Sequence, residues 1–93
     1  MMGAIPANLS KLKKEDVDKE ILRIGMIAEL DAVNLYEQLA ATTTNENIKK
    51  ILLDIAKEEK THVGEFQALL LRLDHEQQKE LEAGENEVAE KTE

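Results

Sequence analysis

The chain has 93 residues, of which 12 are basic and 20 are acidic, and its net charge is −8. It contains no cysteine, which excludes disulfides and thiolate metal sites, and one Tyr and one Phe are its aromatic residues. This composition disfavours nucleic-acid binding, which rewards basic patches and stacking rings. Because a domain this small buries little surface, we expect it to depend on a partner copy or on a metal held by nitrogen and oxygen ligands.

Residues 1–13 are expected to form a flexible N-terminal arm. They contain Gly3, Asn8, Ser10 and the only proline, Pro6, all of which favour turns. They lack the basic region followed by an apolar run that marks a signal peptide. No apolar run in the chain approaches the roughly 18–20 residues of a membrane span. We therefore expect a soluble, cytoplasmic protein.

Two long helices are predicted next, over residues 14–41 and 46–73. Within the first, only Gly25 disfavours a helix. The Thr-Thr-Thr-Asn run between them favours a turn, and Asn45 is typical of a helix N-cap. Since the connection is short, the two helices are expected to form an antiparallel hairpin.

A short third helix is predicted over residues 75–83. Asp74 followed by Gln77 resembles a capping box at its start, and Gly84 is expected to end it. Residues 84–93 contain one apolar side chain larger than alanine. This last segment is therefore expected to be a disordered polar tail.

The predicted fold class is all-α, an antiparallel two-helix hairpin with a short C-terminal helix, and its single domain covers residues 14–83. Two helices cannot cover each other's apolar faces, whereas four helices from two chains can. We therefore expect two chains to dimerise into a four-helix bundle.

Both long helices contain a line of core positions spaced alternately by three and four residues, as in packed helices. In the second helix two consecutive core positions are polar, Glu59 and His62, and in the first helix Glu29 is the acidic exception. The core positions are Leu22, Gly25, Glu29, Ala32, Tyr36 and Leu39, then Ile48, Leu52, Ile55, Glu59, His62, Phe66, Leu69 and Leu73.

A carboxylate in a bundle core is costly unless it is paired or bound to metal. Glu29 precedes the loop and Glu59 follows it by similar numbers of residues, so the two are expected to lie side by side. Together with His62 they offer ligands that iron, manganese and zinc accept. The alternative is a non-enzymatic dimerisation module in which this buried polar group fixes the helix register.

Stoichiometry favours a shared site. Di-iron sites in four-helix bundles take one Glu from each of two helices and a Glu-x-x-His from each of the other two. This chain supplies half of that set, as Glu29, Glu59 and His62. Two copies related by a two-fold axis would supply all of it, which predicts a di-iron site between two chains.

Two segments, Ile27–Glu37 and Ala56–His62, resemble the encapsulated ferritin-like proteins, and so does the 30-residue gap between Glu29 and Glu59. The resemblance covers about residues 14–83. It implies a ferritin-like bundle that acts as a ferroxidase, oxidising Fe(II) to Fe(III) at a di-iron site across a dimer interface. It also implies a ring of dimers, such as a decamer, inside an encapsulin shell where the iron is stored as mineral.

The same resemblance implies roles for individual residues. Asp31 matches one position of an acidic iron-uptake site, whereas Ala28 replaces its second carboxylate, and Glu58 matches an outer metal position. Tyr36 would lie beside the iron centre, or serve only in packing. The chain ends without a recognisable shell-docking peptide, which fits a shortened chain or a domain fused to its shell protein. The residues assigned to catalysis are Glu29, Glu59, His62 and Tyr36, the first three as iron ligands.

Two further alternatives stay open at this point. A peroxide-reducing di-iron enzyme would need the same ligands, and zinc or manganese could replace iron in such a site.

Overall fold

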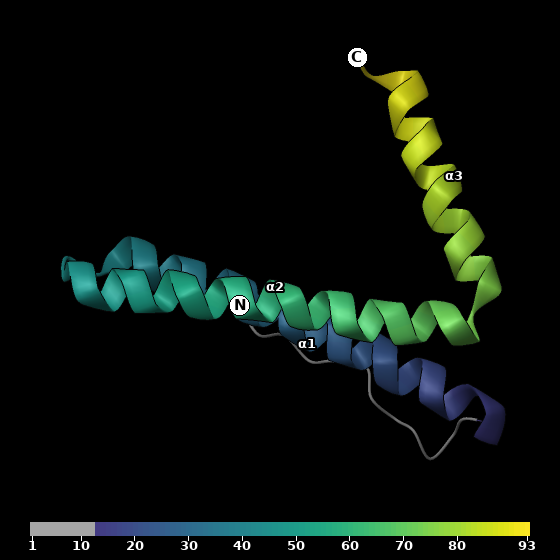
Figure 1. The fold of residues 1–93 in the computed structure, drawn as a ribbon, viewed down its shortest axis with the longest axis horizontal. Helices are drawn as coiled ribbons and strands as arrows, with labels where there is room; N and C mark the ends of the chain where they lie inside the picture. The colour runs from purple at the N-terminus through teal and green to yellow at the C-terminus, as the bar shows by residue number, and fades with distance from the viewer. Residues whose placement is uncertain (1–12) are drawn as a thin grey trace.

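The structure is a computed structural model that describes residues 13–93. It contains three helices, α1 (Lys14–Thr42), α2 (Glu46–Leu73) and α3 (His75–Lys91), and no strand among the described residues. α1 and α2 lie side by side as an antiparallel hairpin, and α3 projects away from one end of it (Figure 1). The all-α hairpin predicted from the sequence is confirmed, whereas the expected arm lies, apart from Lys13, outside the described residues.

Two side-chain caps define where α2 and α3 begin. The Asn45 side-chain oxygen accepts hydrogen bonds from the backbone N–H groups of Asn47 and Ile48, at 3.0 and 3.1 Å. Asp74 accepts one from the Gln77 N–H at 3.0 Å. Each cap satisfies helix-start donors that have no partner within the helix, and both caps agree with the sequence prediction.

The predicted end of the third helix at Gly84 is wrong, because α3 continues to Lys91. A glycine ends a helix by adopting a left-handed conformation, and no described glycine has a positive φ. The residues that follow Gly84 are mostly Glu, Ala and Lys. Their helix propensity outweighs the roughly 1 kcal/mol cost of one glycine, so the segment expected to be a disordered tail is helical as far as Lys91. The domain boundaries themselves stay a prediction.

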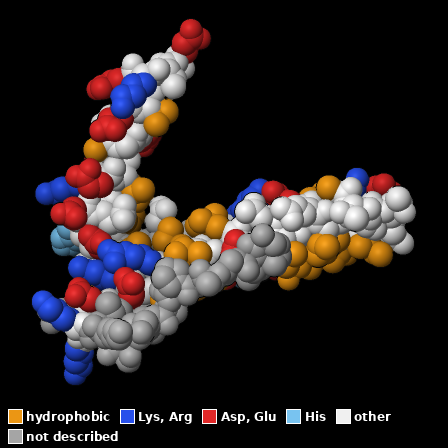
Figure 2. All heavy atoms as spheres, turned by 180° about the vertical axis from the view of Figure 1, so that it is seen from behind, with side chains coloured by type: hydrophobic (Ala, Val, Ile, Leu, Met, Phe, Trp, Pro, Cys, Tyr) orange, Lys and Arg blue, Asp and Glu red, His pale blue; other side chains and the backbone are white. Residues whose placement is uncertain are grey.

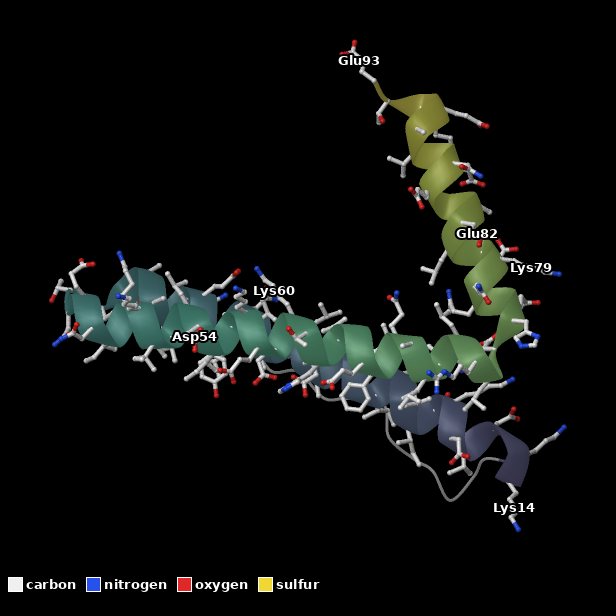
Figure 3. All side chains as sticks on the ribbon, in the orientation of Figure 1. Lys14, Asp54, Lys60, Lys79, Glu82 and Glu93 are labelled. Carbon is white, nitrogen blue, oxygen red and sulfur yellow. The ribbon has the colours of Figure 1, made fainter. Side chains whose placement is uncertain are left out.

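The core of the hairpin is small. Val33 and Ala40 of α1 and Ala56 and Leu70 of α2 are the buried apolar side chains among the described residues. Figure 2 shows apolar side chains gathered along the hairpin and charged ones along α3. Lys79, Glu82 and Glu93 project from the α3 end of the chain into solvent (Figure 3).

Much of the apolar surface of the hairpin therefore has no cover within one chain. Large apolar side chains that are 43–61% exposed occur on all three helices. Where such side chains are contiguous, they are typical of interaction surfaces. The exposed side chains are Ile21, Ile27, Leu30, Leu39, Ile48, Ile51, Leu53, Leu69, Leu73, Leu81 and Val88.

Candidate metal centre

The hairpin brings Glu29, Glu59 and His62 together at one site. The His62 Nδ1 atom lies 3.3 Å from Glu29 Oε2 and 3.4 Å from Glu59 Oε2. One ligand atom from each of the three residues falls within 4.8 Å of the other two. Side chains that are 33 residues apart in the sequence thus form a compact group of two carboxylates and one imidazole.

Local and long-range geometry each contribute to this group. Glu59 and His62 are neighbours because residues three apart lie on the same face of a helix. Glu29 reaches them only through the antiparallel pairing of α1 with α2, in which it lies level with His62 and contacts its ring nitrogen. The sequence placed Glu29 beside Glu59, and the structure adds that the histidine lies between the two carboxylates.

The group is open on one side. The side chains of Glu29 and Glu59 are 20% and 19% exposed, and that of His62 is 43% exposed. Ile48 and Leu69 lie fourteen and seven residues from His62 on α2, so all three side chains point from the same face of the helix. Both apolar side chains are about half exposed, so the polar group is flanked by uncovered apolar surface.

The donor atoms suit a divalent cation. Metal–ligand bonds of about 2.1 Å place neighbouring donors roughly 3–3.4 Å apart, which matches the observed 3.3 and 3.4 Å separations. Carboxylate oxygens with an imidazole are ligands for iron, manganese and zinc. As hydrogen bonds these separations are long, since N–H···O bonds are typically about 2.7–3.2 Å, and the two carboxylates would have to share the single hydrogen of Nδ1.

The structure does not bring the two secondary acidic residues of the prediction into this group. Asp31 on α1 and Glu58 on α2 are not among the clustered acidic and histidine side chains of the described residues. Tyr36 is half-buried on α1, seven residues after Glu29 and hence on the same face of the helix. The roles of these three residues stay predictions.

Sequence reasoning missed a close contact next to the group. A Cβ atom added to Gly25 would lie 3.0 Å from the Cε1 and Cζ atoms of Phe66, so the phenyl ring packs directly against the α1 backbone. The signal that could have found it is a glycine at a core position of a helix, where a larger apolar residue is the rule.

A helical hairpin that holds one carboxylate on one helix and a Glu-x-x-His on the other has the ligand arrangement of half of a metal-carboxylate four-helix bundle. Comparison with known proteins then identifies the family. Residues 5–86 match the model of the EncFtn-like family, and the chain belongs to this family.

Two similar proteins have names that refer to encapsulin. Over 73 residues the chain is 64% identical to the "Ferritin-like-encapsulin shell fusion protein" of Pyrococcus furiosus. This alignment covers 78% of the chain and 21% of that protein. It is 45% identical over 56 residues to the "Encapsulin nanocompartment cargo protein EncC" of Myxococcus xanthus, covering 60% of this chain and 43% of that protein. The chain thus spans less than half the length of either relative.

A solved structure shares the fold. The crystal structure of the encapsulated ferritin domain from Pyrococcus furiosus superposes with a TM-score of 0.82 at 53% sequence identity, over 97% of this chain and 92% of that one. Separately, among residues 13–93 no helix has both the length and the hydropathy needed to cross a membrane.

Proposed function

We propose that this chain is a ferroxidase subunit that oxidises Fe(II) to Fe(III) at a di-iron site shared by two copies. The observation that supports it best is the convergence of Glu29, Glu59 and His62, with donor atoms within 4.8 Å of one another, on an open face of the hairpin. Membership of the EncFtn-like family agrees with a role in iron handling.

The three side chains have distinct roles in this proposal. Glu29 and Glu59 offset the charge of ferrous iron, the substrate, and their hard oxygen donors favour the ferric product. His62 binds through a ring nitrogen that must have released its proton. Ferrous ions held here would each give one electron to dioxygen, and the chain provides the ligands and fixes their positions.

A second copy completes the ligand set. One chain offers two carboxylates and one imidazole, and a two-fold axis beside the group doubles this to four carboxylates and two imidazoles, the set that bundle di-iron sites use. The exposed apolar side chains that flank His62, such as Ile48 and Leu69, provide the surface for that contact. We propose a homodimer as the functional unit, assembled further into a ring such as a decamer.

The names of the relatives support a place for this activity. One relative is named as a fusion with an encapsulin shell and another as an encapsulin cargo protein. We infer that this chain acts inside an encapsulin nanocompartment in the cytoplasm, with the shell protein as its partner and iron mineral as the store for its product.

Stopped-flow absorbance after mixing with Fe(II) and oxygen tests the proposal. Glu29→Ala and His62→Ala should each abolish rapid oxidation while far-UV circular dichroism stays close to that of wild type. Glu65→Ala removes an exposed carboxylate of α2 that lies outside the group, and it should oxidise iron at the wild-type rate. Near-normal oxidation in both site variants would refute the site. Hydrogen peroxide in place of oxygen distinguishes a peroxide-reducing enzyme.

One observation favours a second function. The His62 Nδ1 atom is within hydrogen-bond distance of both carboxylates, as a buried polar group that fixes helix register would be. Such a dimerisation module would bind almost no iron, zinc or manganese. Metal analysis of the purified protein therefore separates it from the ferroxidase.

A further inference from the structure

Gly25 and Phe66 form the layer of the hairpin next to the candidate metal centre. Gly25 lies four residues before Glu29 on α1, and Phe66 lies four residues after His62 on α2. Because α1 and α2 are antiparallel, four residues back along α1 and four residues forward along α2 lead in the same direction. They lead from the Glu29–His62 contact to the Gly25–Phe66 contact. The two contacts thus belong to the same register on the same side of the hairpin.

The Gly25–Phe66 contact leaves too little space for a side chain at position 25 unless its surroundings shift. A Cβ atom at position 25 would lie 3.0 Å from Cε1, 3.0 Å from Cζ and 3.1 Å from Cδ1 of Phe66. A methyl group at position 25 would therefore be crowded by three atoms of one rigid ring, and either the ring or the helices would have to move. No such contact surrounds Gly64 or Gly84, where an added Cβ atom meets nothing within 4 Å.

We propose that Gly25 and Phe66 are positioning residues for the metal centre: the ring of Phe66, seated against the bare backbone at Gly25, sets the spacing of α1 and α2 at the neighbouring layer. This proposal rests on the proposed function. Glu29 is the only member of the group that comes from α1, so its distance to His62 and Glu59 depends on that spacing. A displacement of a few tenths of an ångström changes a ligand geometry that metals require within about 0.2 Å.

The test measures binding of Co(II) alone, without oxygen or turnover, from the intensity and shape of its visible absorption. Gly25→Ala should bind Co(II) roughly tenfold more weakly, the lower end of the loss seen when a supporting group of a metal site is removed, with an altered absorption band. Gly64→Ala, the matched control on α2, should bind as wild type does. Alanine favours helix over glycine, so neither variant is expected to lose helix content.

A double-mutant cycle with Phe66→Leu identifies the contact as the cause. Leucine has no ring atoms to meet the new methyl group, so Gly25→Ala should have no effect on Co(II) binding in the Phe66→Leu background. If Gly25→Ala instead reduces helix content, recovery of that content in the double variant supports the contact, and failure to recover contradicts it.

The outcomes separate this proposal from the function on which it rests. If the wild type binds Co(II) and Gly25→Ala binds it equally tightly, the positioning role alone is overturned. The same holds if Gly25→Ala weakens Co(II) binding equally in the wild-type and Phe66→Leu backgrounds. A wild-type chain that binds no Co(II) overturns the shared metal site, and the positioning role with it.

Discussion

Arg23 and Asp74, which are 51 residues apart in the sequence, form an ion pair with 2.9 Å between Nη2 and Oδ2. Asp74 lies where α2 ends and α3 begins. Its backbone N–H donates to the Leu70 carbonyl at 2.9 Å, and its side chain accepts the Gln77 N–H. One carboxylate therefore caps α3 and also joins its first turn to α1.

This joint should be sensitive to acid. The hydrogen bond from the Gln77 N–H, followed by the interactions with Arg23 and Lys19, lowers the pKa of Asp74 below its ordinary value of 3.8, against an opposing effect of desolvation. Because the pKa of Asp74 is lower in the folded state, its stabilising effect is fully present at pH values above its ordinary pKa. That effect is lost as the pH falls through the folded-state pKa. We expect the amide of Gln77 to lose its protection from hydrogen exchange in that acidic range.

Two variants define the source of the acid effect. Asp74→Asn keeps the shape of the cap, but its side chain cannot titrate. In this variant the protection of the Gln77 amide from hydrogen exchange should therefore show no step at acidic pH. Arg23→Gln should raise the Asp74 pKa and move the step to higher pH. An unchanged step in both variants would rule out this carboxylate as the origin.

The N-cap of α2 should contribute measurably to stability. Asn45→Ala leaves the N–H groups of Asn47 and Ile48 without their protein acceptor, and loss of such a cap costs about 0.5–2 kcal/mol. Urea unfolding monitored by circular dichroism should show a lower midpoint with an unchanged slope. Asn45→Asp, which retains the acceptor, should unfold close to wild type, and equal losses in the two variants would contradict the cap.

Gly84 offers a site where a substitution should stabilise the protein. It lies inside α3, with no left-handed backbone and open space around it. Replacing a helix-interior glycine with alanine stabilises by up to about 1 kcal/mol. Thermal unfolding of Gly84→Ala should therefore show a higher Tm and a stronger helix signal than wild type. A weaker helix signal would indicate that α3 ends near this glycine in solution.

The apolar face around His62 should be needed for pairing of the chains. Leu69 and Leu53 are 47% and 48% exposed. Leu69 is seven residues from His62, on its face of α2, and Leu53 is nine residues away, on the opposite side. Leu69→Glu should prevent the increase in mass that light scattering records for wild type with Fe(II), whereas Leu53→Glu should retain the dimer. A wild-type chain that stays monomeric with iron would count against the shared site.

The sequence by itself determined the local features of this protein. Asn45 and Asp74 cap helices through bonds to residues two or three positions away, and Glu59 and His62 share a face because of helical spacing alone. Such features involve one element each, so residue type and spacing are sufficient to predict them. The prediction that the third helix ends at Gly84 was wrong because the end of a helix depends on the summed helix propensities of a whole segment. One glycine did not outweigh those of the residues that follow it.

Distance from the loop predicted that Glu29 and Glu59 lie at the same level of the hairpin, but the tertiary structure decided the exact register of α1 and α2. A shift of one residue in the pairing of α1 with α2 would move Glu29 away from His62, and it would also separate Gly25 from Phe66. The spacing within either helix says nothing about that register, because it results from close packing between the helices. The ion pair between Arg23 and Asp74 has the same origin, since it needs the junction of α2 and α3 to lie beside α1.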